Sequence, residues 1–152
     1  MITLSTKGRY GVRAMVELAR HYGQGPLPIR DIADRQRIPV PYLEQLLVKL
    51  RRSTLVESVR GRHGGYVLGR PPDQIRVGDV VRVLEGPISL CECVSPRSGE
   101  VCDMVDHCVT KLLWARMSKR IEEIFDDISL HTLLAEAANI ERRLGKNAKN
   151  LS

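Results

Sequence analysis

Apolar residues recur every three or four positions in the first third of the chain, a spacing that places them on one face of an α-helix. The pattern predicts a helix over residues 5–22, ended by a Gly-Gln-Gly-Pro segment because glycine and proline do not continue a helix. A second, shorter helix is predicted over residues 29–36, directly after Pro28. After a break with two prolines, a stripe of leucines predicts a third helix over residues 42–53.

Residues typical of β-strands replace the helical pattern after the third helix. Two strands are predicted over residues 55–59 and 66–68, with a basic, glycine-rich segment between them. Two short helices separated by a tight break and followed by a β-hairpin are the arrangement of a winged helix-turn-helix. A further helix is predicted over residues 76–84, after the Pro-Pro-Asp sequence that follows the hairpin.

The second half of the chain is predicted to contain one long helix, over residues 106–128. Such a helix is about 33 Å long, which is more than a small winged helix needs for its own core. We therefore expect its apolar seam to pair with the same seam of a second copy in a homodimer. The alternative is packing only against a last helix, predicted over residues 130–144. The expected interface residues are Leu113, Met117, Ile121, Ile124 and Ile128.

These elements predict a mostly helical fold of the α+β class, with an N-terminal winged helix-turn-helix and a long C-terminal dimerisation helix. The expected segments are a winged-helix domain (1–84), a cysteine-bearing loop (85–107), dimerisation helices (108–145) and a disordered polar tail (146–152). A chain of 152 residues has room for one domain with an appendage rather than for two full domains. No apolar run approaches the ~20 residues of a membrane span, and the N-terminus lacks a signal-peptide pattern, so we expect a cytoplasmic protein.

Positive charge is concentrated in the first half of the chain. The net charge is +6, and residues 1–82 contain 15 of the 24 Lys and Arg residues but only 7 of the 18 Asp and Glu residues. The rest of the chain is slightly acidic. This distribution is typical of a domain that binds a polyanion, joined to a segment with another role.

The third helix and the hairpin supply candidate contacts to double-stranded DNA. Gln45, near the start of the helix, can pair with adenine in the major groove, and Glu44 can accept from cytosine. Arg60 and Arg62, between the two strands, can enter a narrow minor groove. Phosphate contacts are expected from the basic end of the helix, at Lys49, Arg51 and Arg52.

The cysteines are clustered rather than scattered through the apolar segments. All of them, Cys91, Cys93, Cys102 and Cys108, lie within 18 consecutive residues. In a reducing compartment such a group favours metal or redox chemistry over disulfides. The spacing Cys-x-Cys-x8-Cys-x5-Cys lacks the paired Cys-x2-Cys of a zinc ribbon, so it favours an iron–sulfur cluster. Zinc and metal-free thiol redox chemistry are the alternatives, and His107 is a further possible ligand.

Four short motifs, in this order, resemble those of the IscR-type iron–sulfur cluster regulators and their winged-helix relatives. They are LSTKGRY at residues 4–10, YLEQ at 42–45, VRG followed by GGY at 59–66, and CVTKLLW at 108–114. The resemblance covers about residues 1–135. It implies a homodimeric transcription regulator of promoter DNA, with a [2Fe–2S] cluster held by three cysteines and one further residue. Lys7 and Tyr42, inside these motifs, join the candidate DNA contacts.

The cysteine spacing departs from the pattern that the resemblance implies. Only Cys102 and Cys108 keep the five-residue spacing of the family, because Cys93 lies three residues further upstream. Some relatives take a fourth ligand from positions occupied here by Lys111 and Arg9, neither of which suits iron. The expected ligands are therefore Cys93, Cys102, Cys108 and, as the fourth, Cys91, with His107 as its substitute. A site made only of cysteines suits a [2Fe–2S] cluster, which we favour, or a [4Fe–4S] cluster.

The expected function is that of a regulator that senses iron–sulfur cluster status and controls cluster-assembly or related stress genes. Two alternatives keep the regulator without a cluster: a thiol redox sensor, or a repressor that acts through a partner enzyme. A third, of another class, is a small iron–sulfur electron-transfer protein, against which the basic helix-turn-helix argues. We expect no enzymatic activity, because the sequence shows no nucleophile–base pair and no nucleotide-binding motif.

Overall fold

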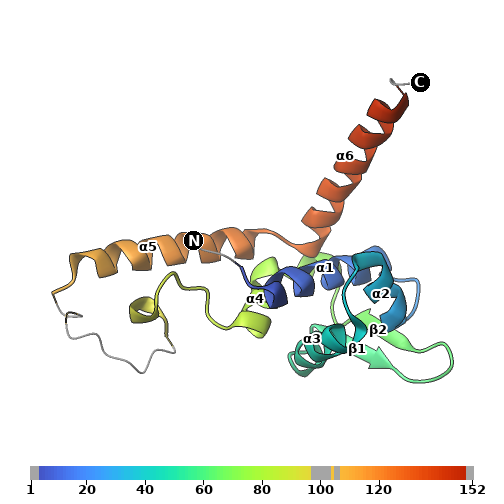
Figure 1. The fold of residues 1–152 in the computed structure, drawn as a ribbon, viewed down its shortest axis with the longest axis horizontal. Coiled ribbons are helices and arrows are strands. Elements are labelled where there is room, and N and C mark those ends of the chain that lie inside the picture. The colour runs from blue at the N-terminus through green and yellow to red at the C-terminus, as the bar shows by residue number, and fades with distance from the viewer. Residues whose placement is uncertain (1–3, 97–103, 105–106, 150–152) are drawn as a thin grey trace.

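The computed structural model describes residues 4–96, 104 and 107–149, and for residues 145–149 it describes the backbone alone. The first half contains α1 (Thr6–Arg20), α2 (Ile29–Gln36), α3 (Val40–Arg52), β1 (Val56–Val59), β2 (Gly65–Leu68), the short 3₁₀ helix η1 (Pro72–Gln74) and α4 (Val77–Glu85). The second half contains the 3₁₀ helix η2 (Glu92–Val94), α5 (Val109–Asp127) and α6 (Leu130–Lys149). This arrangement confirms the predicted fold class, a mostly helical winged helix with a long C-terminal helix (Figure 1).

The helices of the first half begin and end where their local sequences favour it. The side chain of Ser5 caps α1 by accepting from the backbone N–H of Lys7 (3.1 Å). A proline precedes α2, which ends at Arg37 in the left-handed conformation (φ 51°). Pro41 lies in the first turn of α3, where a missing backbone N–H costs no helical hydrogen bond.

The core lies between α1, α2, α3, α4 and the hairpin. The strands β1 and β2 pair antiparallel from Val56↔Leu68 to Val59↔Gly65. Gly65 packs against the segment before α2, and a Cβ there would overlap the carbonyl oxygen of Leu27. The largest fully buried side chains include Met15, Leu18, Leu27, Ile32, Leu43, Leu47, Leu50, Leu55 and Ile75. The domain therefore has one continuous apolar core.

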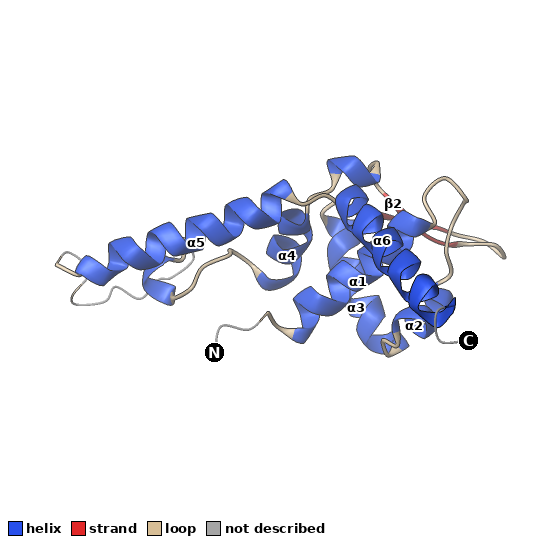
Figure 2. Cartoon of the chain, turned by 90° about the horizontal axis from the view of Figure 1, so that it is seen from above, coloured by secondary structure: helices blue, strands red, loops and turns tan. Residues whose placement is uncertain are grey.

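The second half of the chain extends away from this core. α5 runs from the cysteine-bearing segment to the winged helix, so that segment and the hairpin lie at opposite ends of the molecule (Figure 1 and Figure 2). The first half of α6 packs on α1, with Leu133 and Leu134 against the core. Its second half projects from the body of the molecule (Figure 1). None of the helices in the described part of the chain combines the length and apolar character of a membrane span.

Two predicted boundaries in the second half differ from the structure. The polar tail was expected to be disordered from residue 146, but α6 continues to Lys149. A glycine costs only about 1 kcal/mol inside a helix, and the lysines and alanine that follow it are good helix formers. The long helix begins at Val109 rather than at residue 106, which lies outside the described residues, and Cys108 is its N-cap.

Candidate functional site

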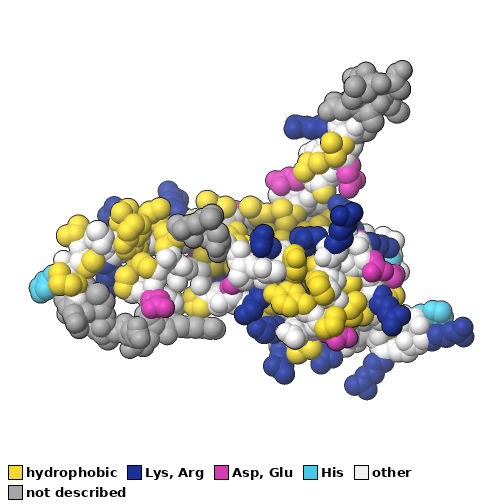
Figure 3. All heavy atoms as spheres, in the orientation of Figure 1, with side chains coloured by type: hydrophobic (Ala, Val, Ile, Leu, Met, Phe, Trp, Pro, Cys, Tyr) yellow, Lys and Arg dark blue, Asp and Glu magenta, His cyan; other side chains and the backbone are white. Residues whose placement is uncertain are grey.

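The polar face of α3 is exposed, as expected for a recognition helix. Glu44 and Gln45 in its first half are exposed, and so is Lys49 in its second half. Arg60 and Arg62 are exposed in the segment between the two strands. Lys and Arg side chains gather over the winged helix on the face that Figure 3 shows. This surface combines the positive charge and the two protruding elements that a DNA duplex requires.

Two of the predicted DNA contacts, Tyr42 and Arg51, have other structural partners. Tyr42 is half-buried, and its ring meets that of Tyr10 edge-to-face with the centroids 5.9 Å apart. Arg51 is exposed but its Nη1 donates to Ser58 Oγ (3.1 Å), which ties the end of α3 to β1. Lys7 is exposed in the first turn of α1, beside the end of α4, because the next residue donates its N–H to Glu85 (2.9 Å). Arg52 has no such partner among the described residues and is exposed.

Two further arginines of the helix-turn-helix, which were not among the predicted DNA contacts, are exposed. Arg30 lies in the first turn of α2, and Arg37 is the residue that ends this helix. Both add positive charge to the exposed surface of the helix-turn-helix, and arginine is a usual donor to DNA phosphates. Their positions in the sequence could have indicated them, because each is a basic residue at one end of the predicted second helix.

A buried carboxylate holds the helix-turn-helix together. Glu17 of α1 is only 3 % exposed, and its two oxygens accept from Arg35 Nη1 (2.9 Å) and Gln36 Nε2 (2.8 Å) at the end of α2. Arg13 donates to Gln36 as well, and its guanidinium lies 5.3 Å from the ring centroid of Tyr10. These contacts hold the end of α2 against α1. Because α3 follows directly after this end, they also help to determine the position of α3.

The structure brings two of the cysteines into contact. The Sγ atoms of Cys91 and Cys93 are 3.4 Å apart, because the 3₁₀ helix η2 turns the chain between them. Cys108 begins α5, and its Sγ lies 3.1 Å from Thr110 Oγ1. Cys102 lies outside the described residues, and His107 is exposed. Among the residues that the structure describes, no three His, Cys, Asp or Glu side chains are grouped to hold a metal ion.

The electrostatics of the described thiols are linked. Partial burial raises the pKa of Cys91, and so do its hydrogen bond with Cys93 and the negative charges of Cys93 and Cys108. The pKa of Cys108 is lowered by the hydrogen bond with Thr110 and by the backbone N–H groups at the start of α5. The 3₁₀ helix η2, which contains Cys93, packs against α5, whose N-cap is Cys108, so the three described thiols lie at the same end of the molecule.

The predicted apolar seam of α5 divides into two parts. Leu113, Met117 and Ile124 are exposed, and apolar side chains lie along α5 in Figure 3. Ile121 instead points into a cavity of the same chain, and Ile128 is half-buried where α5 ends. Val109, which has the spacing of the predicted seam, is exposed as well, and Leu112 and Trp114 add exposed apolar surface beside it.

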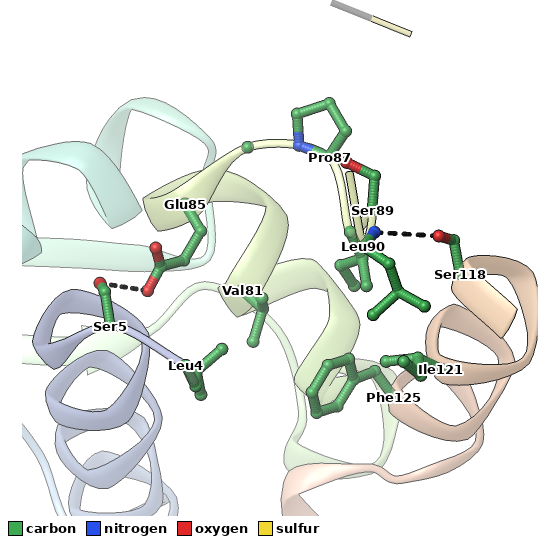
Figure 4. A pocket seen from close by; sticks show the side chains of 12 residues that line it. Leu4, Ser5, Val81, Glu85, Pro87, Ser89, Leu90, Ser118, Ile121 and Phe125 are labelled. Atoms are coloured by element: carbon green, nitrogen blue, oxygen red, sulfur yellow. Dashed lines mark hydrogen bonds between the residues drawn. The ribbon is translucent and has the colours of Figure 1, made fainter. Parts of the chain in front are cut away.

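The cavity connects the cysteine-bearing segment with the winged helix. It measures about 280 Å³ and lies between the start of α1, the end of α4, residues 86–90 and α5 (Figure 4). Ser118 on α5 accepts from the backbone N–H of Leu90 (3.0 Å), and Glu85 accepts from Ser5. The chain that leads to Cys91 is thus held to α5 on one side and to the start of α1 on the other.

A winged helix with an exposed basic recognition helix defines the class of DNA-binding transcription regulators, which are not enzymes. Comparison of the sequence with protein families agrees: residues 4–136 match the Rrf2 family, described as iron-dependent transcriptional regulators. The chain belongs to this family.

Two kinds of relatives are similar over most of the chain. IscR of Sodalis glossinidius is 44 % identical over 132 residues, which are 87 % of this chain and 78 % of that protein. The structure of T. potens IscR matches with a TM-score of 0.74 and 46 % identity, over 90 % of this chain and 88 % of that one. The structure of CymR, the global cysteine regulator of B. subtilis, matches with a TM-score of 0.76 and 43 % identity, over 90 % and 98 % of the two chains.

Proposed function

We propose that this regulator is a homodimer that senses iron–sulfur status through a cluster held by Cys93, Cys102, Cys108 and Cys91. The observation that carries the proposal is the 3.4 Å approach of the Cys91 and Cys93 sulfur atoms, with Cys108 close enough to influence Cys91 electrostatically. Thiolates are the ligands that iron–sulfur clusters require. The similarity to IscR proteins supports the same assignment, and we expect control of cluster-assembly or related stress genes.

The residues of the site are suited to this role in different ways. The hydrogen bond with Thr110 and the backbone N–H groups at the start of α5 lower the pKa of Cys108, which favours the thiolate form that binds metals. Cys91 and Cys93 are in contact, so one turn of chain offers two ligands. His107 is exposed beside Cys108 and is the substitute for Cys91. When bound, the cluster supplies a group that forms only while iron and sulfide are available and that changes charge on reduction.

The chain before Cys91 is connected to the start of α1 through Glu85. Ligation of Cys91 would fix residues 86–90, which begin directly after Glu85. The carboxylate of Glu85 accepts from Ser5 and from the backbone N–H of Gly8, at the start of α1. A change in the conformation of the cysteine-bearing segment therefore acts on the helix that supports the helix-turn-helix.

The exposed stripe of α5 favours a second copy of the chain as the dimer partner. An exposed Leu or Ile side chain gains about 1.5–3 kcal/mol when it is buried, and several such residues follow one another along α5. A symmetric dimer would also present two recognition helices to two half-sites, the usual arrangement for helix-turn-helix proteins.

A second candidate function is metal-free thiol sensing. The contact between Cys91 and Cys93 that suits a cluster also favours oxidation of the two thiols by a peroxide or a disulfide. The similarity to CymR, named a global cysteine regulator, supports this alternative.

Anaerobic purification distinguishes the two functions. We expect the protein to show an iron–sulfur absorption spectrum with stoichiometric iron and sulfide, and Cys93→Ala, Cys102→Ala and Cys108→Ala to lose both. Cys91→Ala is expected to lose them too, whereas a retained spectrum would transfer the fourth ligand to His107. Glu92→Ala, an exposed neighbour, is the control. Iron-free protein whose DNA affinity changes with a thiol oxidant would support thiol sensing instead.

The DNA-binding surface is tested separately with selected duplexes. Gln45→Ala is expected to relax the preference at one base pair by about 1–3 kcal/mol, because it removes a base contact. Arg60→Ala is expected to weaken binding mainly at sites with an A·T-rich minor groove. Wild-type sequence preference in both variants would contradict the proposed docking.

A further inference from the structure

The long helix α5 joins the winged helix through a few specific contacts at its C-terminal end. The backbone N–H of Val77 donates to the carbonyl oxygen of Ile128 (2.9 Å), and the N–H of Leu130 donates to that of Ile75 (3.0 Å). These bonds hold the beginning of α4 against the end of α5 at one point. These two bonds by themselves do not determine the angle between the two helices, which depends on contacts further along them.

Arg82 supplies a second point of attachment. It lies on α4 about 7 Å along the helix from Val77. Its Nη2 donates to Asp126 Oδ1 (2.5 Å) and its Nη1 to Glu122 Oε1 (3.1 Å). These two carboxylates are one helical turn apart on α5, so the planar guanidinium spans two turns of the long helix. We name Arg82, Glu122 and Asp126 the α4–α5 clamp.

Gly78 makes the close approach of the two helices possible. It is buried one turn before Arg82, and a Cβ at this position would overlap Oδ1 of Asp126. Asp79 supports the guanidinium from its own helix at 3.7 Å and caps α4 by accepting from the backbone N–H of Arg76 (3.1 Å). Gly78 and Asp79 thus restrict the conformations of the clamp side chains.

We propose that Arg82 is a positioning residue for DNA recognition, which sets the spacing between the two half-sites that a dimer binds. The proposal rests on the homodimer argued above. All of the exposed stripe of α5 except Ile124 lies N-terminal to the clamp, so the clamp sets the direction in which each winged helix leaves the dimer. The N-terminal end of α5 lies about 22 Å along the helix from the clamp, and a rotation of about 10° at the clamp moves that end by about 4 Å. That displacement exceeds the rise of about 3.4 Å per base pair.

The experiment measures the spacing preference directly. In vitro selection from random duplexes with the full-length wild type defines the operator and its spacer. Affinity is then measured by fluorescence anisotropy for this operator, for spacers one or two base pairs longer or shorter, and for a single half-site. The variants are Arg82→Met and the conservative Arg82→Lys. Arg20→Met is the matched control, because Arg20 also joins two helices through an ion pair, with Glu141 at 3.2 Å.

We expect the wild type and Arg20→Met to prefer one spacer by about tenfold or more over spacers one base pair away. Arg82→Met should reduce this preference to below about threefold while half-site affinity stays within about twofold, and Arg82→Lys should restore part of it. Where Arg82→Met fails to fold, the pair Glu122→Gln with Asp126→Asn gives the same readout. An unchanged preference in a dimeric variant, or an equal loss at every spacing and at the half-site, overturns the proposal.

Two other outcomes would contradict the proposed function and not only the role of Arg82. A wild type that sediments as a monomer and binds single half-sites overturns the dimer and the positioning role together. A wild type that binds no selected duplex overturns the DNA-binding assignment itself.

Discussion

The helices α3 and α5 carry similar apolar stripes in opposite environments. The stripe of α3 is at most 2 % exposed at Leu43, Leu46, Leu47 and Leu50. In α5, the exposed fraction is 49 % for Leu113, 41 % for Met117 and 58 % for Ile124. The polar faces differ as well. The basic residues of α3 face solvent, whereas the acidic residues Glu122 and Asp126 of α5 accept hydrogen bonds from Arg82. One stripe completes a core within the chain, and the other is exposed on its surface, where the proposed dimer would bury it.

This difference separates two kinds of stability. The winged helix buries its apolar residues by itself, so its free energy of unfolding is set by packing inside one chain. α5 buries only one side, at the cavity and the clamp, and the rest of its apolar surface gains stability only on association. Substitutions in the two stripes should therefore differ in their dependence on protein concentration.

Leu47→Ala should have the largest effect. The side chain is fully buried, so truncation is expected to lower the free energy of unfolding by about 2–5 kcal/mol. Urea denaturation followed by circular dichroism measures this change. The matched variant Leu113→Ala should shift the transition only through its dependence on protein concentration. A concentration-independent loss in both variants would contradict the contrast between the stripes.

Replacing Leu113 and Ile124 together with Asp should dissociate the dimer. A carboxylate buried without a partner in an apolar interface is costly, so association is expected to weaken by several kcal/mol. Sedimentation equilibrium measures the change, and circular dichroism should still show a folded winged helix. Ile121→Asp is the comparison, since this side chain lines the cavity of its own chain and should destabilise the monomer. A double variant that remains dimeric would move the interface to another surface.

The winged helix could be predicted from sequence because each of its elements carries its own signals. The predicted range of the second helix, residues 29–36, agrees with α2, and the strands agree within one residue at each end. Apolar spacing, prolines and glycines act through local sequence, and in this region the tertiary contacts favour the same helices and strands.

The orientation of α5 depended on information that the apolar pattern does not contain. The seam included Ile121 because spacing alone cannot distinguish a side chain that packs inside the chain from one that packs on a partner. The face of α5 that is turned towards the winged helix depends on contacts such as those of Arg82 on α4 with Glu122 and Asp126. The continuation of α6 past residue 145 was missed for a similar reason, because a polar segment has no pattern that distinguishes helix from coil.

The candidate sites were predictable in composition but not in contacts. The sequence indicated the cysteine cluster, and η2 brings Cys91 and Cys93 together despite their short spacing. Nothing in the sequence indicated that Arg51 would bind Ser58 or that Tyr42 would pack on Tyr10. Such pairings depend on how elements cross in space.

Glu17→Gln should have an intermediate effect. The carboxylate is buried, and the substitution removes its charge-assisted hydrogen bond with Arg35, so the expected loss is about 1–3 kcal/mol of unfolding free energy. Glu141→Gln removes the exposed ion pair with Arg20 and should cost less than about 1 kcal/mol. Thermal unfolding at matched concentrations compares the two. Equal losses of unfolding free energy would mean that the buried contacts of Glu17 contribute no more to stability than the exposed ion pair between Arg20 and Glu141.

Thr110→Val should have the smallest effect on stability, because Thr110 lies at the exposed N-terminal end of α5. It should instead change the reactivity of the Cys108 thiol. The Thr110 hydroxyl is the main cause of the lowered pKa of Cys108, so its removal is expected to raise that pKa. Since the thiolate is the reactive form, the midpoint of alkylation against pH should move upward, with slower reaction at neutral pH. The rate of iodoacetamide labelling is measured in metal-free protein in which Cys91, Cys93 and Cys102 are Ala, so that Cys108 alone reports. Thr110→Ser should keep the original midpoint, and Thr132→Val, which removes a hydroxyl from α6 near Ser129, should leave it unchanged. A midpoint that stays constant in Thr110→Val would mean that the backbone N–H groups of α5 alone hold the thiolate.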